Sequence, residues 1–69
     1  MKNARIISTI MDLRDNRIRL QRQVAWLEDK AFWEPNAFTE DDAFWLRYYR
    51  AEIARIKADE EALRHRITD

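Results

Sequence analysis

The chain has 69 residues, with thirteen basic and thirteen acidic side chains, one histidine, one proline, and neither cysteine nor glycine. A chain of this length forms one domain at most and buries too little surface to be stable alone, so we expect another chain to complete its core. The composition excludes disulfides and thiolate metal sites, and a formal net charge of zero gives no general attraction to nucleic acid or to anionic membranes.

The only proline, Pro35, marks the end of a first predicted helix over residues 3–33. Asn3 is a candidate N-cap, and the residue before a proline is driven toward extended backbone geometry, which stops a helix. Residues 34–38 are predicted to form the turn. A connection this short makes the two helices that it joins antiparallel.

The second predicted helix covers residues 39–67. Thr39 can cap its first turn, and the three acidic residues after Thr39 favour the positive end of the helix dipole. The basic residues that suit the other end are Arg64, His65 and Arg66.

Both predicted helices carry an apolar row with alternating spacings of four and three residues, which is typical of a coiled-coil seam. The first row is Ile6, Ile10, Leu13, Arg17, Leu20, Val24, Leu27 and Ala31. The second row is Leu46, Tyr49, Ile53, Ile56, Glu60, Leu63 and Ile67. Folding at the turn pairs Leu27 with Leu46 and Ile10 with Leu63. The predicted fold class is therefore all-α, an antiparallel two-helix hairpin with a coiled-coil seam.

One charged residue interrupts each row, Arg17 in the first and Glu60 in the second. We expect both side chains to extend to solvent at the rim of the seam, because an unpaired charge in a buried position is costly. The alternative is an ion pair across the seam that fixes the register of the helices.

The first helix has a second apolar stripe, turned roughly 100° from the seam. The stripe consists of Ile7, Met11, Ile18 and Ala25. Two hairpins packed through this stripe would form a homodimeric four-helix bundle with two-fold symmetry, which is our prediction. The alternative is that the stripe binds a foreign protein and that the free chain is loosely folded.

All eight aromatic residues fall between positions 26 and 49. Tyr49 belongs to the seam and Trp45 to its edge. Large aromatic side chains on the outer sides of helices, close to arginines, are typical of binding hot spots. The residues predicted to bind a protein partner are Trp26, Trp33, Phe44, Tyr48 and Arg47. The alternative is that the dimer partner or the loop covers these aromatic side chains.

The residues indicate no enzyme. The chain has no glycine for a phosphate-binding loop and no cysteine nucleophile, and its single serine, Ser8, has no activating residue nearby in sequence. We expect no catalytic residue, no cofactor, no metal and no small-molecule substrate. No apolar stretch is long enough for a signal peptide or a membrane-spanning helix, so we expect no membrane partner and a cytoplasmic location.

Two resemblances bear on function. The first concerns RNA binding, for which the middle of the first helix offers four arginines, Arg14, Arg17, Arg19 and Arg22. The architecture resembles the Rop family of plasmid copy-control proteins, hairpin dimers that grip paired RNA loops with their first helix. In size and architecture the chain also resembles small helical-hairpin regulators of phages and mobile elements, which bind and disable a host transcription factor or motor protein. We expect a regulator that binds and inhibits another protein, with RNA binding as the alternative.

Overall fold

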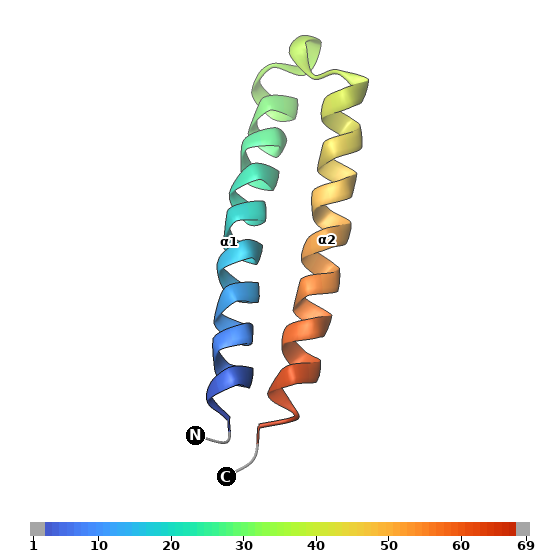
Figure 1. Ribbon diagram of the computed structural model, residues 1–69. Coiled ribbons are helices and arrows are strands. Elements are labelled where there is room, and N and C mark those ends of the chain that lie inside the picture. The colour runs from blue at the N-terminus through green and yellow to red at the C-terminus, as the bar shows by residue number, and fades with distance from the viewer. Residues whose placement is uncertain (1–2, 68–69) are drawn as a thin grey trace.

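The computed structural model describes residues 3–67, which form a helical hairpin. Helix α1 is Ala4–Trp33, a short 3₁₀ turn η1 is Pro35–Ala37, and helix α2 is Glu40–Arg64. Figure 1 shows α1 and α2 side by side, with the loop at one end and the start of α1 beside the end of α2 at the other. The predicted all-helical, antiparallel hairpin is confirmed.

Capping interactions set the start of α2. The Thr39 hydroxyl accepts a hydrogen bond from the Asp42 backbone N–H at 3.1 Å, and the Asp42 carboxylate accepts one from the Thr39 backbone N–H at 3.0 Å. This reciprocal pair is a capping box, which satisfies two backbone donors that a helix start otherwise leaves without partners. The prediction that Thr39 caps the second helix is confirmed.

The opposite end of the hairpin differs from the prediction in two details. Asn3 occupies the N-cap position of α1, but its side chain makes no capping hydrogen bond. Helix α2 ends at Arg64, before the predicted end at Ile67. The backbone N–H groups of Arg66 and Ile67 bond to the carbonyls of Leu63 and Arg64 at 3.0 and 3.3 Å, so the chain closes into tight turns there.

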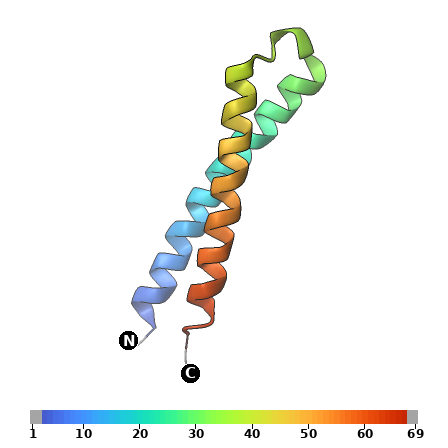
Figure 2. The same ribbon diagram turned by 90° about the vertical axis from the view of Figure 1, so that its right-hand side faces the viewer.

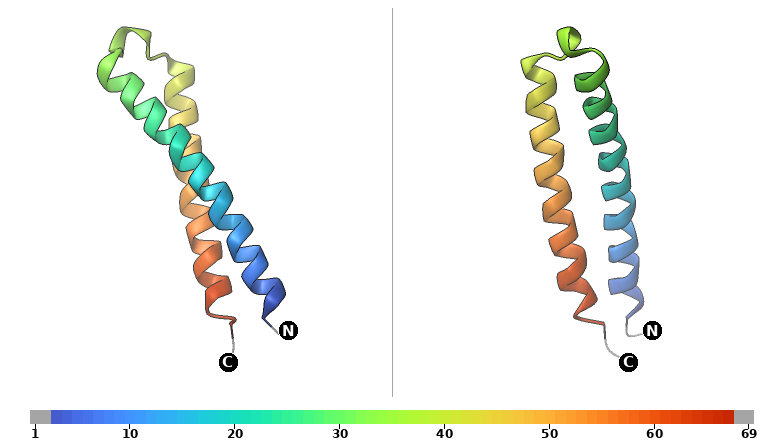
Figure 3. Two further views of the ribbon diagram at one scale, coloured as in Figure 1. Left: turned by 90° about the vertical axis from the view of Figure 1, so that its left-hand side faces the viewer. Right: turned by 180° about the vertical axis from the view of Figure 1, so that it is seen from behind.

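Burial follows the two predicted rows. The most buried apolar residues are Leu27, Leu46, Ile53 and Ile56, and Ile56 is only 1% exposed. Glu60 is buried as well, the remaining members from Ile6 to Leu63 are half-buried, and Ile67, the last predicted member, is exposed. Turned views show that the two helices cross at an angle (Figure 2 and Figure 3). The seam is therefore a single layer of side chains between two crossing helices.

Arg17 and Glu60 do not extend to the rim, and the expectation that they do so is wrong. Arg17 Nε donates to Glu60 Oε1 at 2.7 Å, and Arg17 Nη2 donates to Glu60 Oε2 at 3.4 Å. Glu60 is 5% exposed and too short to reach solvent, whereas the long Arg17 side chain reaches one layer along the seam to meet it. Two charge-assisted hydrogen bonds offset part of the cost of burying the carboxylate.

The described hairpin is a thin rod of 53 × 14 × 14 Å. Its radius of gyration of 15.8 Å exceeds the value of about 11 Å for a compact domain of this length. Its accessible surface of 5623 Å² exceeds the roughly 4,650 Å² of a compact monomer of this mass by about 1,000 Å². The hairpin thus leaves much surface uncovered, and large apolar side chains such as Met11, Trp26 and Trp33 are part of it. Neither described helix is long and apolar enough to cross a membrane.

Candidate partner-binding surface

Exposed aromatic side chains gather in the loop half of the hairpin. The exposed rings are those of Trp26, Phe32, Trp33, Phe44, Trp45 and Tyr48. Their exposed fractions run from 46% to 73%, whereas Phe38 and Tyr49 are half-buried. All four aromatic residues predicted to bind a partner are among the six, and Arg47 is exposed as well. The single-layer seam has no room for these rings, so they remain on the surface.

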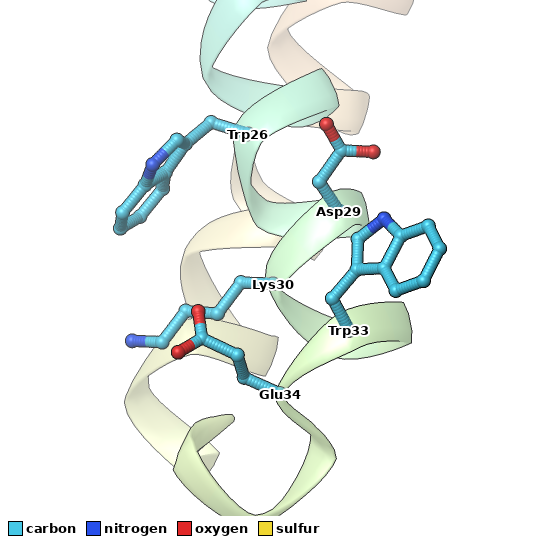
Figure 4. A pocket seen from close by; sticks show the side chains of 5 residues that line it. All are labelled: Trp26, Asp29, Lys30, Trp33 and Glu34. Carbon is cyan, nitrogen blue, oxygen red and sulfur yellow. The ribbon is translucent and has the colours of Figure 1, made fainter.

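On α1, the aromatic side chains border a shallow hollow of about 170 Å³. The residues that line it are Trp26, Asp29, Lys30, Trp33 and Glu34. Figure 4 shows the indole rings of Trp26 and Trp33 pointing away from each other, with Lys30 extending on the side of Trp26. The two tryptophans belong to one helical row, yet their side chains open the hollow between them.

Lys30 connects the hollow to the start of α2. Its ammonium lies 2.8 Å from the Asp42 carboxylate and 5.5 Å from the centroid of the Trp26 ring, within cation–π range. The hydrogen bond from Lys30, followed by the one from the Thr39 backbone N–H, holds the pKa of Asp42 below its usual value. Because Asp42 also belongs to the capping box, one carboxylate fixes both the helix start and a contact between the helices.

On α2, four rings form a continuous cluster. Phe44 and Tyr48 stack with centroids 6.4 Å apart and planes 7° from parallel. Trp45 contacts three rings, with centroid distances of 5.3 Å to Phe44, 5.6 Å to Tyr48 and 5.8 Å to Tyr49. Trp45 was predicted at the edge of the seam and not among the binding residues. Its spacing of three and four residues from Tyr48 and Tyr49 was the signal for its central place.

The predicted patch is therefore divided between two clusters. The α1 cluster comprises Trp26, Phe32 and Trp33, and the α2 cluster comprises Phe44, Trp45, Tyr48 and Tyr49. Every ring contact within residues 3–67 joins rings of the same helix. Arg47 lies about 100° from Tyr48 around α2 and makes no hydrogen bond or ion pair to the described residues.

The stripe predicted to form the dimer lies on the other broad face of the hairpin. Its members, Ile7, Met11, Ile18 and Ala25, are all exposed. Ala25 is one turn before Glu28, which pairs with Arg50 of α2 at 2.7 Å along one edge of the seam. Trp26 is one turn before Lys30, which pairs with α2 along the opposite edge. Two different apolar surfaces thus flank the seam.

The arginines of α1 do not form one basic face. Arg17 is bound in the seam to Glu60. Arg14 lies 3.6 Å from Asp15, and Arg19 donates a hydrogen bond to Asn16. The carboxylates of Glu60 and Asp15 lower the positive potential that RNA phosphates would meet along this helix.

Comparisons with protein-family models, with curated proteins and with solved structures found no match for this chain. Within residues 3–67, no three His, Cys, Asp or Glu side chains are grouped so that they could hold a metal ion. Of the three acidic residues after Thr39, Asp42 belongs to the capping box, and Glu40 and Asp41 lie in the first turn of α2.

Proposed function

We propose that this chain is a non-catalytic regulator that acts as a homodimer and binds another protein through the aromatic clusters at the loop end. Binding inhibits that partner by occupying a surface that the partner needs. A transcription factor or another host protein is the proposed class of target, by resemblance to the small hairpin regulators of phages and mobile elements.

One observation carries this proposal: six exposed aromatic side chains at one end of a rod. Exposed apolar surface of this extent is costly in water unless a partner covers it. Aromatic rings are also the side chains that contribute most to binding hot spots, because each covers a large area with few rotatable bonds. The ring contacts of the α2 cluster, and the contact of Phe32 with Trp33 on α1, hold these side chains in place before binding, which lowers the entropy lost on association.

The dimer is proposed on separate grounds. The aliphatic stripe of Ile7, Met11, Ile18 and Ala25 lies exposed on the face away from the Trp26 hollow. Pairing two hairpins through it would give a four-helix bundle in which α1 of one copy packs against α1 of the other. Such a dimer leaves Trp26, Trp33 and the α2 cluster open to a different protein, whereas Phe32 lies on the side of the aliphatic stripe.

The test compares single substitutions in the two clusters with one in the arginines. A partner captured from host lysate on the wild-type protein is purified and titrated against variants. Trp26→Ala and Tyr48→Ala should each weaken binding by about 2 kcal/mol, or roughly 30-fold, while helicity and dimer mass stay unchanged. Arg19→Ala is the control and should change affinity little.

Three outcomes would contradict the proposal. The first is that Trp26→Ala and Tyr48→Ala bind every captured protein as tightly as the wild type does. The second is that both substitutions unfold the chain, in which case the rings serve folding. The third is that the captured partner is RNA, with an affinity that falls steeply with salt and a salt slope that Arg19→Ala reduces.

A further inference from the structure

The outer row of α1 is apolar along the whole helix. It consists of Ala4, Met11, Ile18, Ala25 and Phe32, which follow one another at intervals of seven residues. All five side chains are exposed. A strict seven-residue repeat stays on one side of a helix that supercoils left-handedly around a partner. The row therefore has the pattern of a second coiled-coil surface, on the side of α1 that α2 does not cover.

The sizes of these side chains indicate the direction of the partner helix. If a second α1 runs antiparallel with the two-fold axis at Ile18, Ala4 faces Phe32 and Met11 faces Ala25. Each of these layers then combines a small side chain with a large one. In a parallel pair, Phe32 faces Phe32 and Ala25 faces Ala25, which makes one layer too full and the next one empty.

We propose that two copies of this chain associate through the outer rows of α1, antiparallel, with the two-fold axis at Ile18. This inference rests on the homodimer proposed above and adds its direction and register. The occupant of the aliphatic face is thus a second copy of the same helix.

The charges beside the row agree with this arrangement. Asp15 and Arg22 lie on one flank, one turn after Met11 and Ile18, and the axis at Ile18 brings Arg22 of each copy beside Asp15 of the other. Within residues 3–67 Arg22 has no ion pair. A parallel pair would instead bring Glu28 of one copy beside Asp29 of the other, where like charges repel, and Arg14 beside Asp15, which already lie 3.6 Å apart within one chain.

The position of the two-fold axis and the accessible surface of the hairpin also agree with an antiparallel pair. Ile18 lies at the middle of α1, Ala4–Trp33, so the two helices overlap over their full length. The hairpin's accessible surface exceeds that of a compact monomer by about 1,000 Å², so the chain can lose the roughly 800 Å² of a standard interface and still expose as much surface as a compact chain. As a consequence, the aromatic clusters of the two copies lie at opposite ends of the dimer.

Cysteine cross-linking tests the arrangement directly, because the chain has no cysteine of its own. The variants are Met11→Cys, Ala25→Cys and Ile18→Cys, oxidised alone and as a mixture of the first two. We expect a disulfide between Met11→Cys and Ala25→Cys chains in the mixture, and none when either is alone. Ile18→Cys should cross-link with itself. Ala51→Cys, an exposed alanine replacement on α2, is the matched control and should cross-link with none of them.

The separation along the helix makes this result decisive. In the antiparallel pair, two Met11→Cys side chains are about 21 Å apart along the axis, far beyond the ~7 Å Cα separation that a disulfide allows. Self-linking of Met11→Cys and of Ala25→Cys would therefore show a parallel dimer and overturn the inference. A dimer in light scattering without any cross-link through the outer row would overturn it as well, and would leave the dimer itself standing. A monomer in light scattering would overturn both.

A second measurement does not depend on disulfide chemistry. Spin labels on Ala25→Cys in the reduced protein should report a separation of about 20 Å or more in the antiparallel dimer, since the two positions are then about 21 Å apart along the axis. Labels in direct contact would overturn the antiparallel register.

Discussion

Arg17 and Ile18 are neighbours on α1. In a monomer the apolar isoleucine would be expected in the seam and the charged arginine on the outside, but the two positions are reversed. Arg17 faces the seam, where its side chain is 22% exposed, and Ile18 faces outward with 37% of its surface exposed. The seam around Arg17 satisfies its charge within the chain, through the paired carboxylate of Glu60. The outer row around Ile18 has no counterpart within the hairpin.

This difference separates two kinds of surface. The seam and the loop-end contacts are complete within one chain, so changes there should alter folding. The outer row and the aromatic clusters are left open, so changes there should alter association and leave the hairpin fold intact. A substitution in the seam that alters only association, or one in the outer row that unfolds the hairpin, would contradict this distinction.

The largest effect should come from Arg17→Met, which removes the only partner that the buried Glu60 carboxylate has among residues 3–67. We expect the free energy of unfolding to fall by about 3 kcal/mol, because the carboxylate stays buried without an opposite charge. Urea unfolding at one fixed protein concentration measures this, since the stability of a dimer depends on concentration.

A double-mutant cycle gives the control for the Arg17 prediction. Arg17→Met combined with Glu60→Leu replaces the pair by apolar side chains and should recover most of the lost stability. Single variants that each cost under about 0.5 kcal/mol, with no coupling between them, would contradict the buried pair.

Ile18→Asp should act on the dimer. A carboxylate from each copy at the two-fold axis brings two like charges together in an apolar contact, and we expect the dimer dissociation constant to rise at least about 30-fold, roughly 2 kcal/mol. Sedimentation or light scattering over a range of concentrations measures it. Trp26→Asp is the matched control on the opposite face. If it dissociates the dimer and Ile18→Asp does not, the two faces have been assigned the wrong way round.

How far the sequence predicts this molecule depends on which physical property decides each feature. The seam follows from the spacing of Leu27, Leu46 and Ile53, because helical periodicity alone places them on facing rows. The contact of Arg17 with Glu60 depends on how far each side chain reaches, which spacing does not give.

The candidate surface shows the same limit. Spacing correctly places Trp26 and Trp33 in one row on the outside of the first helix. It does not reveal that their rings diverge around a hollow, because side-chain rotamers depend on neighbours such as Lys30. The central position of Trp45 among three rings was missed for a different reason, because its spacing from Tyr48 and Tyr49 indicates that position but was interpreted as the edge of the seam.

The capping box at the loop should contribute a smaller amount to folding. Thr39→Ala removes the side-chain oxygen that accepts from the Asp42 N–H, and we expect a loss of about 1 kcal/mol in the free energy of unfolding. Thr9→Ala is the matched control, since the Thr9 hydroxyl bonds back to Arg5 within α1 and caps nothing. Equal effects from both substitutions would mean that the box adds no stability.

The smallest predicted effect is a pH dependence at the loop. Lys30 and the Thr39 N–H hold the pKa of Asp42 below its usual value, so its contribution to stability is fully present above the pKa of the unfolded chain, about 3.9. That contribution is lost as the pH falls through the lower pKa of the folded state, so the free energy of unfolding should decline on acidification below about pH 5. Asp42→Asn should flatten part of this decline, and Lys30→Met should do the same because it removes the main cause of the lowered pKa. Asp41→Asn removes a charge from the same helical turn without touching Lys30 or Thr39, and should keep the decline. Titration by NMR locates the pKa of Asp42 in each variant. A decline that is identical in wild type, Asp42→Asn and Lys30→Met would show that the loop-end ion pair does not couple to folding.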